Sequence, residues 1–338
     1  MSIRVKACLT LAAAVALSLV STGLGVPTAA SSKHLVNVSL RLDYLAAGSQ
    51  APFFLALERG YYKSEGLNVN ILDGQGSSVT VQQVGSGANT FGWASMPAFA
   101  EGTASGIPVK SVAMITSKST YAVFVPKSSS IHGLSGLYGK TVLVAEGTAD
   151  LSIFKAMLTL NHIDTSRINI TTLGEGVLER DYVAGQGDAL VGQVPYGQPA
   201  IAARPSRELL FAKYGFNLQD YGLIAQNSYI QSHPKIVKEF VAGSVKGWAA
   251  AKNAYAAAEA LKKYRPQADV SAAKQQDALY RQFIFSKATR GQPIGCASPS
   301  DWKTGLKILK ETHDLTGNIK NLGRFFTNQF VPGCHIHA

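Results

Sequence analysis

The stretch LDYLAAGSQAPFFLALERGYYKSEGL, residues 42–67, decides the fold. It follows Val36–Leu42, where apolar and polar residues alternate as in a half-buried strand. A small polar loop then leads into a helix predicted over Pro52–Gly60, and a basic, aromatic and glycine-containing segment leads to a second strand, Val69–Leu72. A strand, a helix and a strand in this order predict a parallel pair joined by a right-handed crossover.

The same pattern continues along the chain. A helix over Thr80–Ser86 precedes a strand over Phe91–Ala94, and further strands are expected at Val109–Ile115 and Tyr121–Val125. The short polar segment Thr116–Thr120 is interpreted as a first crossing between two lobes, and Tyr221–Gln226 as the return crossing. The predicted fold class is α/β with two lobes. Each lobe is a mostly parallel sheet flanked by helices, and two crossover strands join the lobes.

The 338 residues exceed one typical domain, which favours two lobes that each bury a core. Residues 1–30 have the features of an export signal: Arg4 and Lys6 precede an apolar run over 9–20, and VPTAAS forms a small-residue cleavage zone. We expect cleavage near residue 30 and a periplasmic protein. Residues 34–118 and 224–338 are predicted to form lobe 1, and residues 119–223 lobe 2.

Charge and cysteine content limit the kinds of site that the protein can carry. The formal charge of +11 falls to +9 when Arg4 and Lys6 leave with the signal, and the other basic residues are scattered at helical surface spacing. This distribution favours a solvated face over a nucleic-acid site. Cys296 and Cys334 remain after processing, and an even count in an oxidising compartment predicts a disulfide. His335 and His337 beside Cys334 resemble a metal tail, but the expected disulfide favours no metal, and no cofactor is predicted.

Ligands of open α/β sheets bind beyond the carboxyl ends of the strands. The loops that follow the predicted strands therefore supply the candidate ligand-binding residues, which combine aromatic rings, neutral hydrogen-bonding groups and carboxylates. They are Asp43, Tyr44, Ser49, Gln50, Ser77, Trp93, Ser95, Thr120, Tyr121, Glu146, Thr148, Glu175 and Gln193.

Several roles are open within this set. Tyr44, Trp93 and Tyr121 are expected to stack on a planar ligand, and the alternative for Trp93 is a core residue. Ser49 and Thr148 precede predicted helices, whose free N–H groups attract an acceptor atom or an anion. The three carboxylates favour a ligand amine, amidine or aminopyrimidine, because a carboxylate in a closing crevice needs a partner. Alternatively, Glu175 pairs with Arg180, and Asp43 with Arg41 or a backbone amide.

LDY followed by APFFLALERGYYKSEGLNV is similar to the opening signature of periplasmic solute-binding proteins for nitrate, taurine, alkanesulfonates and pyrimidine precursors of thiamine. The likeness extends from about Val36 to about Gln193. It implies a two-lobed periplasmic-binding-protein fold and a role as a subunit of an ABC importer. Leu42–Tyr44 resembles the Leu-Asp-Trp of pyrimidine-precursor binders, which implies that Tyr44 flanks the ligand ring. The next residues depart from that branch, and Ser49–Pro52 looks more like the loop of the sulfonate and taurine branch.

Enzyme motifs are weak. There is no G-x-S-x-G or H-E-x-x-H sequence, and no cysteine-rich segment like that of the related fungal pyrimidine enzymes. The sequence therefore predicts a non-enzymatic binding protein that captures a small sulfonate, pyrimidine or other heteroaromatic or amine-type solute by hinge closure. An enzyme of pyrimidine or thiamine-precursor metabolism on the same scaffold is the alternative. Expected partners are the solute and the membrane permease, with no nucleic acid, and the protein is expected to be a monomer.

Overall fold

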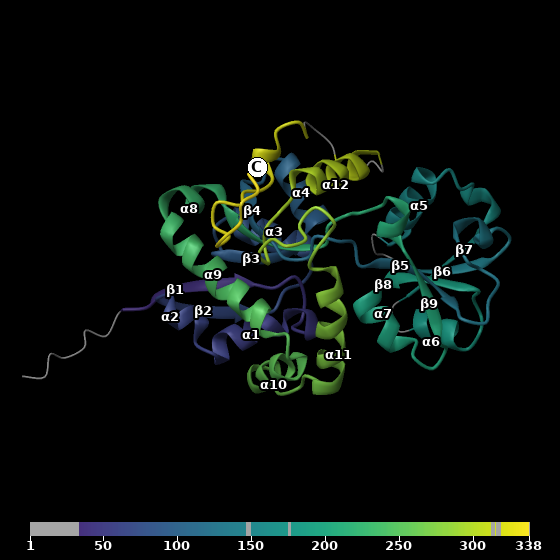
Figure 1. Ribbon diagram of the computed structural model, residues 1–338, viewed down its shortest axis with the longest axis horizontal. Coiled ribbons are helices and arrows are strands. Elements are labelled where there is room, and N and C mark those ends of the chain that lie inside the picture. The colour runs from purple at the N-terminus through teal and green to yellow at the C-terminus, as the bar shows by residue number, and fades with distance from the viewer. Residues whose placement is uncertain (1–33, 147–149, 175–176, 312–314, 316–318, 338) are drawn as a thin grey trace, which may run out of the picture. The chain divides into compact units, whose positions relative to one another are not determined.

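The computed structural model describes residues 34–146, 150–174, 177–311, 315 and 319–337. The predicted export signal, Thr148 and Glu175 lie outside the described residues. Two five-stranded sheets organise the described chain (Figure 1).

The first sheet has the strand order β2-β1-β3-β10-β4. β1 pairs in parallel with both β2 and β3, as the strand and helix pattern predicts, while β10 runs antiparallel to β3 and β4. The strands are β1 (Val36–Arg41), β2 (Leu67–Leu72), β3 (Phe91–Ser95), β4 (Val109–Met114) and β10 (Tyr221–Gln226).

The second sheet repeats this arrangement with the order β7-β6-β8-β5-β9. β6 pairs in parallel with β7 and β8, whereas β5 runs antiparallel to β8 and β9. The strands are β5 (Tyr121–Pro126), β6 (Thr141–Ala145), β7 (Asn169–Leu173), β8 (Ala189–Gln193) and β9 (Ser206–Leu210). Both sheets are mixed, and the predicted α/β class is confirmed.

Helices follow most parallel strands and cover the sheets. Five of them, α1, α4, α7, α9 and α12, have proline in the first turn, where its missing N–H has no intrahelical acceptor to lose. The helices between strands are α1 (Ala51–Glu58), α2 (Tyr61–Ser64), α3 (Ser77–Gly85), α4 (Met96–Ala104), α5 (Asp150–Leu160), α6 (Leu178–Val183) and α7 (Val194–Ala200). Those after β10 are α8 (Asn227–Ser232), α9 (Pro234–Ala250), α10 (Ala254–Tyr264), α11 (Val270–Tyr280) and α12 (Pro299–Glu311).

Short 3-10 helices complete the elements. They are η1 (Gly48–Gln50), η2 (Leu134–Leu137), η3 (Thr165–Arg167), η4 (Phe211–Tyr214), η5 (Arg281–Phe283) and η6 (Leu322–Arg324). None of the described helices is both long and apolar enough to span a membrane.

The predicted return crossing is corrected by the structure. Tyr221–Gln226 is not a connection but β10, a central strand of the first sheet. Its apolar residues are buried on both faces, which is why the short apolar run alone does not reveal its neighbours. The chain returns from β9 through residues 211–220, and this segment bonds to the outgoing one, since the amide of Asp220 donates to the carbonyl of Thr116 at 3.1 Å.

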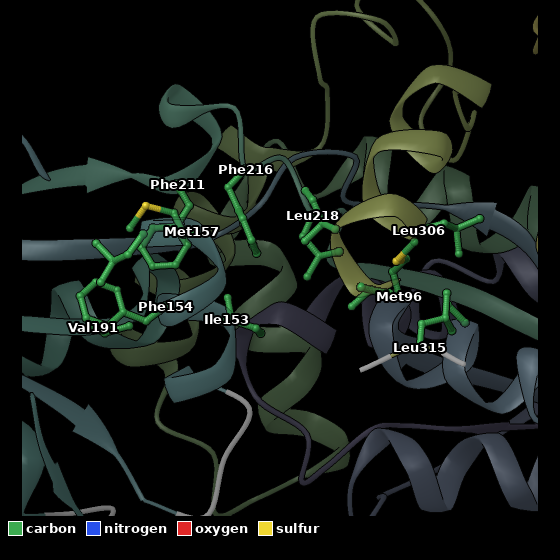
Figure 2. Packing of buried hydrophobic residues seen from close by; sticks show 14 of the residues in the cluster. Met96, Ile153, Phe154, Met157, Val191, Phe211, Phe216, Leu218, Leu306 and Leu315 are labelled. Atoms are coloured by element: carbon green, nitrogen blue, oxygen red, sulfur yellow. The ribbon is translucent and has the colours of Figure 1, made fainter. Parts of the chain in front are cut away.

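The returning segment also carries the packing between the two sheets. Phe211 and Phe216 stack edge to face, with ring centroids 5.8 Å apart, and lie beside Met157 of α5 (Figure 2). Leu218, from the same segment, lies beside Met96 and Leu306 in the same buried cluster. One apolar core therefore continues from the second sheet to the first.

The predicted disulfide is confirmed. Cys296 and Cys334 are bonded, with their Cα atoms 5.6 Å apart and a sequence separation of 38 residues. Their side chains join the aromatic core of the first sheet, Cys296 as a buried member and Cys334 at its edge.

Candidate functional site

The candidate site is a pocket of about 800 Å³ to which both sheets contribute. Its residues lie where parallel strands end and where the antiparallel strands β5 and β10 begin, so one edge of each sheet faces it. It is lined by Asp43, Tyr44, Gly76, Ser77, Ser78, Tyr121, Ala145, Asp150, Leu178, Glu179, Leu190, Val191, Gly192, Gln193, Tyr196, Gly197 and Tyr221. We call the residues from the first sheet's side the first wall, and those from the second sheet's side the second wall.

The first wall is centred on Asp43, which is only 6% exposed. Its Oδ1 atom accepts a hydrogen bond from the Nε2 atom of Gln50 at 2.8 Å, and the Tyr221 side chain is a second partner. Burial raises the pKa of the Asp43 carboxyl, while these hydrogen bonds act in the opposite direction. Arg41, considered above as a partner for Asp43, bonds instead to Asn89 and to the carbonyl of Asp73.

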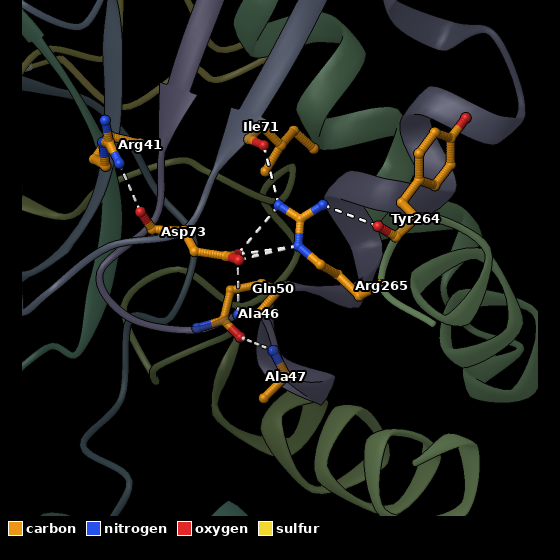
Figure 3. Close-up of polar contacts among 8 residues, drawn as sticks. All are labelled: Arg41, Ala46, Ala47, Gln50, Ile71, Asp73, Tyr264 and Arg265. Carbon is orange, nitrogen blue, oxygen red and sulfur yellow. Dashed lines mark hydrogen bonds and ion pairs between the residues drawn. The ribbon is translucent and has the colours of Figure 1, made fainter. Parts of the chain in front are cut away.

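A second carboxylate fixes the loops that carry the first wall. The guanidinium of Arg265 bonds to both carboxylate oxygens of Asp73 at 3.1–3.2 Å and to the carbonyl of Ile71 (Figure 3). Asp73 in turn accepts from the amide of Ala46, so the loop after β2 is tied to the loop after β1. The loops also approach closely at Gly74, where a Cβ atom would clash with the carbonyl of Leu42.

The second wall contains a chain of three polar side chains. The Nε2 atom of Gln193 donates to the hydroxyl of Tyr121 at 3.3 Å, and this hydroxyl donates to Oδ1 of Asp150 at 3.1 Å. Burial, followed by the nearby charge of Asp150, raises the pKa of Tyr121 well above its ordinary value. Around this chain the wall is apolar, with Ala145, Leu178 and Leu190 facing the pocket.

Ser49 and Tyr196 connect the two walls. The Ser49 Oγ atom lies 2.7 Å from the Tyr196 hydroxyl, and Ser49 also donates to Oε1 of Gln50 at 2.8 Å. The Ser49 and Gln50 side chains are themselves buried behind the pocket lining. Two of the predicted site residues therefore support Asp43 and Tyr196 from behind.

A buried carboxylate also lies where the crossing segments meet. Asp220 accepts a hydrogen bond from the hydroxyl of Thr120 at 2.7 Å and lies 3.5 Å from the hydroxyl of Tyr280. Burial, with a further contribution from the charge of Asp43, raises the pKa of Asp220 to about 7. The predicted site residue Thr120 thus bonds across the two crossing segments and is not part of the lining.

The remaining predicted residues divide between the pocket and its surroundings. Tyr44, which is 60% exposed, and Ser77 line the pocket. Ser95 does not, but its amide donates to the hydroxyl of Ser77 at 3.0 Å. Glu146 is exposed and is not among the lining residues.

The expectation that Trp93 is a stacking platform in a loop is corrected. Trp93 is 0% exposed and belongs to the core, where it packs against Phe53 and Trp248. Its ring stacks on Tyr221 at 5.2 Å between centroids, and Tyr221 is the residue that lines the pocket. Trp93 lies near the end of β3, and the aromatic side chains around it bury its ring completely. It therefore supports the pocket wall from behind and does not contact the pocket.

Sequence reasoning did not include Tyr196, Tyr221 or Asp150 among the candidate site residues. Tyr196 lies three residues after Gln193, at the start of α7, a spacing that brings it to the same edge of the sheet. Tyr221 lines the pocket because β10 begins there, and the direction of β10 is not visible in the sequence. Both tyrosines are buried deeply enough for their pKa values to rise.

Two mixed α/β sheets with a tyrosine-rich pocket at their facing strand ends define a periplasmic binding protein fold. Solved structures agree: the aliphatic sulphonate binding protein SsuA from Escherichia coli matches with a TM-score of 0.68 at 13% identity, over 87% of this chain and 99% of that one. The NMT1/THI5-like family model matches residues 48–258, more than half of the 338-residue chain, so the chain belongs to this family. The family resemblance expected from LDY and the following helix is confirmed.

Two related proteins are named after the ligand that they bind. The chain is 22% identical over 330 residues to the riboflavin-binding protein RibY of Chloroflexus aurantiacus, covering 93% of this chain and 92% of that protein. It is 23% identical over 229 residues to a formylaminopyrimidine-binding protein of Halalkalibacterium halodurans, covering 65% of this chain and 68% of that protein.

Proposed function

We propose that the protein is the extracytoplasmic solute-binding subunit of an ABC importer, which captures a small heteroaromatic solute in the pocket. The observation that carries this proposal is a pocket of about 800 Å³ in which four tyrosines from both sheets surround a buried carboxylate. A volume of this size suits a small organic molecule. Aromatic walls favour a planar ring, and the family and fold support binding as the activity.

The charge of the lining favours a neutral or cationic solute over a sulfonate. Asp43, Asp150 and Glu179 line the pocket, and no lysine, arginine or histidine is among its described lining residues. An anion held there would meet three carboxylates without a basic side chain to offset them. Riboflavin and formylaminopyrimidine, named for the two relatives, are planar heteroaromatic compounds without a phosphate or sulfonate group, so we propose this class for the present chain.

Capture proceeds by closure of the two walls about the crossing segments, without bond making or breaking. A solute that contacts Tyr221 on one wall and Tyr121 on the other stabilises the closed arrangement, because only that arrangement allows both contacts. Residues 1–30 are proposed to direct export, and a membrane permease to accept the loaded form. The monomeric state remains a prediction.

The test is ligand binding by the refolded chain, from which any carried-over solute has been removed. Riboflavin, riboflavin 5′-phosphate, formylaminopyrimidine, taurine and an alkanesulfonate are compared by thermal shift and calorimetry. A true ligand at a hundredfold excess over its Kd stabilises the native state by about 2.7 kcal/mol. We expect this from riboflavin or formylaminopyrimidine, with weaker binding to Asp43→Asn.

Three results would contradict the proposal. One is tightest binding of a sulfonate, which the carboxylates of the pocket disfavour. Another is unchanged affinity in Asp43→Asn, which would place the solute elsewhere. The third is recovery of the solute in altered form by mass spectrometry, which would favour the enzyme alternative.

A further inference from the structure

Hydrogen-bond direction in the second wall is fixed by one residue, Asp150. A carboxylate accepts hydrogen bonds and has no proton to donate, so the contact of 3.1 Å with Tyr121 must use the tyrosine proton. The Tyr121 hydroxyl has only that one proton. Its contact of 3.3 Å with Gln193 must therefore be accepted by the tyrosine oxygen and donated by the glutamine Nε2 atom.

These two hydrogen bonds determine which atom of the Gln193 side-chain amide has no partner. With Nε2 engaged by Tyr121, the Oε1 atom is buried and has no hydrogen-bond partner among the described residues. Gln193 itself lines the pocket. A buried acceptor without a donor costs free energy. A bound molecule whose donor reaches this atom as the two walls close removes that cost.

We propose that Asp150 and Tyr121 are positioning residues that hold the Gln193 amide in one orientation, so that its Oε1 atom recognises an N–H donor of the solute. The inference rests on the proposed function and narrows its solute class to heteroaromatic molecules with an N–H group on the edge that faces Gln193. The same site disfavours a solute of equal shape that presents a ring acceptor or a methyl group there, because Oε1 then stays unpaired.

An isosteric change at Asp150 allows this hydrogen-bond chain to reverse. In Asp150→Asn the new amide can donate to the Tyr121 oxygen, the tyrosine proton can then turn to Gln193 Oε1, and Nε2 is released toward the pocket. Asp150 lies in the first turn of α5, where the substitution removes one favourable charge from the helix N-terminus and leaves the packing of the helix unchanged. Asp181→Asn is the matched control, since Asp181 bonds to the exposed Arg180 on α6 and is not among the lining residues.

The binding experiment uses two pairs of probes. Riboflavin is compared with 3-methylriboflavin, and 4-amino-2-methylpyrimidine with its 4-dimethylamino derivative, by calorimetry on all three proteins. The wild type is expected to prefer the N–H member of at least one pair by about tenfold or more. Asp150→Asn should reduce this preference to about threefold or less, while Asp181→Asn should keep it. Absence of a preference in the wild type, or an unchanged preference in Asp150→Asn, would overturn the proposal.

A second measurement needs no ligand. Hydrogen exchange of the Gln193 side-chain amide, followed by NMR, should be slower in the wild type than in Asp150→Asn, because the tyrosine protects one N–H only in the original direction. Equal exchange in the two proteins would overturn the proposal. If none of the four probes binds while the exchange rates differ as expected, the solute class under the proposed function fails and the orientation of Gln193 is supported.

Discussion

The two walls of the pocket are stabilised in different ways. In the first wall, Tyr221 is supported by packing: it lies on the Trp93 ring, which in turn contacts Phe53 and Trp248 in the core. The second wall presents polar groups whose partners are other pocket residues, as in the chain from Gln193 through Tyr121 to Asp150. The difference indicates that changes behind the first wall act mainly on stability, whereas changes in the second wall act mainly on ligand selectivity.

The largest expected effect is a loss of stability when the side chain that supports the first wall is removed. Trp93→Ala removes a fully buried aromatic side chain and should lower the free energy of unfolding by about 3–5 kcal/mol, measured by urea denaturation. Gln193→Ala is the contrasting variant on the second wall, and it should weaken binding with little change in stability. An intact stability in Trp93→Ala combined with lost affinity would assign Trp93 to ligand contact after all.

A smaller effect concerns the junction between the walls, where Asp220 has a pKa of about 7 in the folded protein. In the unfolded chain an aspartate titrates near about 3.9. Between these values the native carboxyl retains a proton that the unfolded chain has lost, so native stability decreases as the pH rises through this range. Asp277, whose pKa is also raised to about 7 by burial, acts in the same direction.

We therefore expect the protein to be less stable at pH 8 than at pH 5, with Asp220 contributing about 2 kcal/mol of the difference. Asp220→Asn should flatten the pH dependence without removing it, because Asp277 remains. Urea denaturation at the two pH values measures the effect. A wild type that gains stability from pH 5 to pH 8, with the same slope in Asp220→Asn, would exclude a protonated Asp220 in the native state.

The smallest expected effect lies in the loops of the first wall. Arg265→Gln removes the ion pair with Asp73, but both side chains are partly exposed, so the stability loss should be about 1 kcal/mol or less. Affinity should fall about twofold to threefold, because the loop that carries Asp43 is less firmly held. Lys263→Gln, which removes an exposed pair with Glu58, is the control. Equal effects of the two variants on affinity would argue against a role for Asp73 in the wall.

The sequence predicts the fold better than it predicts the site. Alternating apolar residues and the loop-helix pattern after Leu42 are local signals, and they predict the parallel pairs correctly. The assignment of Tyr221–Gln226 as a connection was wrong. The direction and neighbours of β10 depend on its pairing with β3 and β4, which lie far away in the sequence, and no local pattern reveals that pairing.

The same distinction applies to individual site residues. Asp43, Tyr44, Ser77, Tyr121 and Gln193 follow or begin strands and do line the pocket, which the rule for strand ends anticipates. Ser49, Gln50 and Thr120 stand at equally favourable places in the sequence, yet their side chains turn to Tyr196, Asp43 and Asp220. Which way a loop side chain turns depends on partners brought together only by the folded chain.

The disulfide has a consequence for how the molecule is made. Cys334 follows Cys296 by 38 residues and is synthesised after every strand and helix described above. The bond therefore cannot form until both sheets have been translated, so oxidation of this cysteine pair follows synthesis of the framework it joins. A nascent or clipped polypeptide that lacks Cys334 would retain Cys296 as an unpaired thiol, which can form a wrong disulfide with another protein in an oxidising compartment.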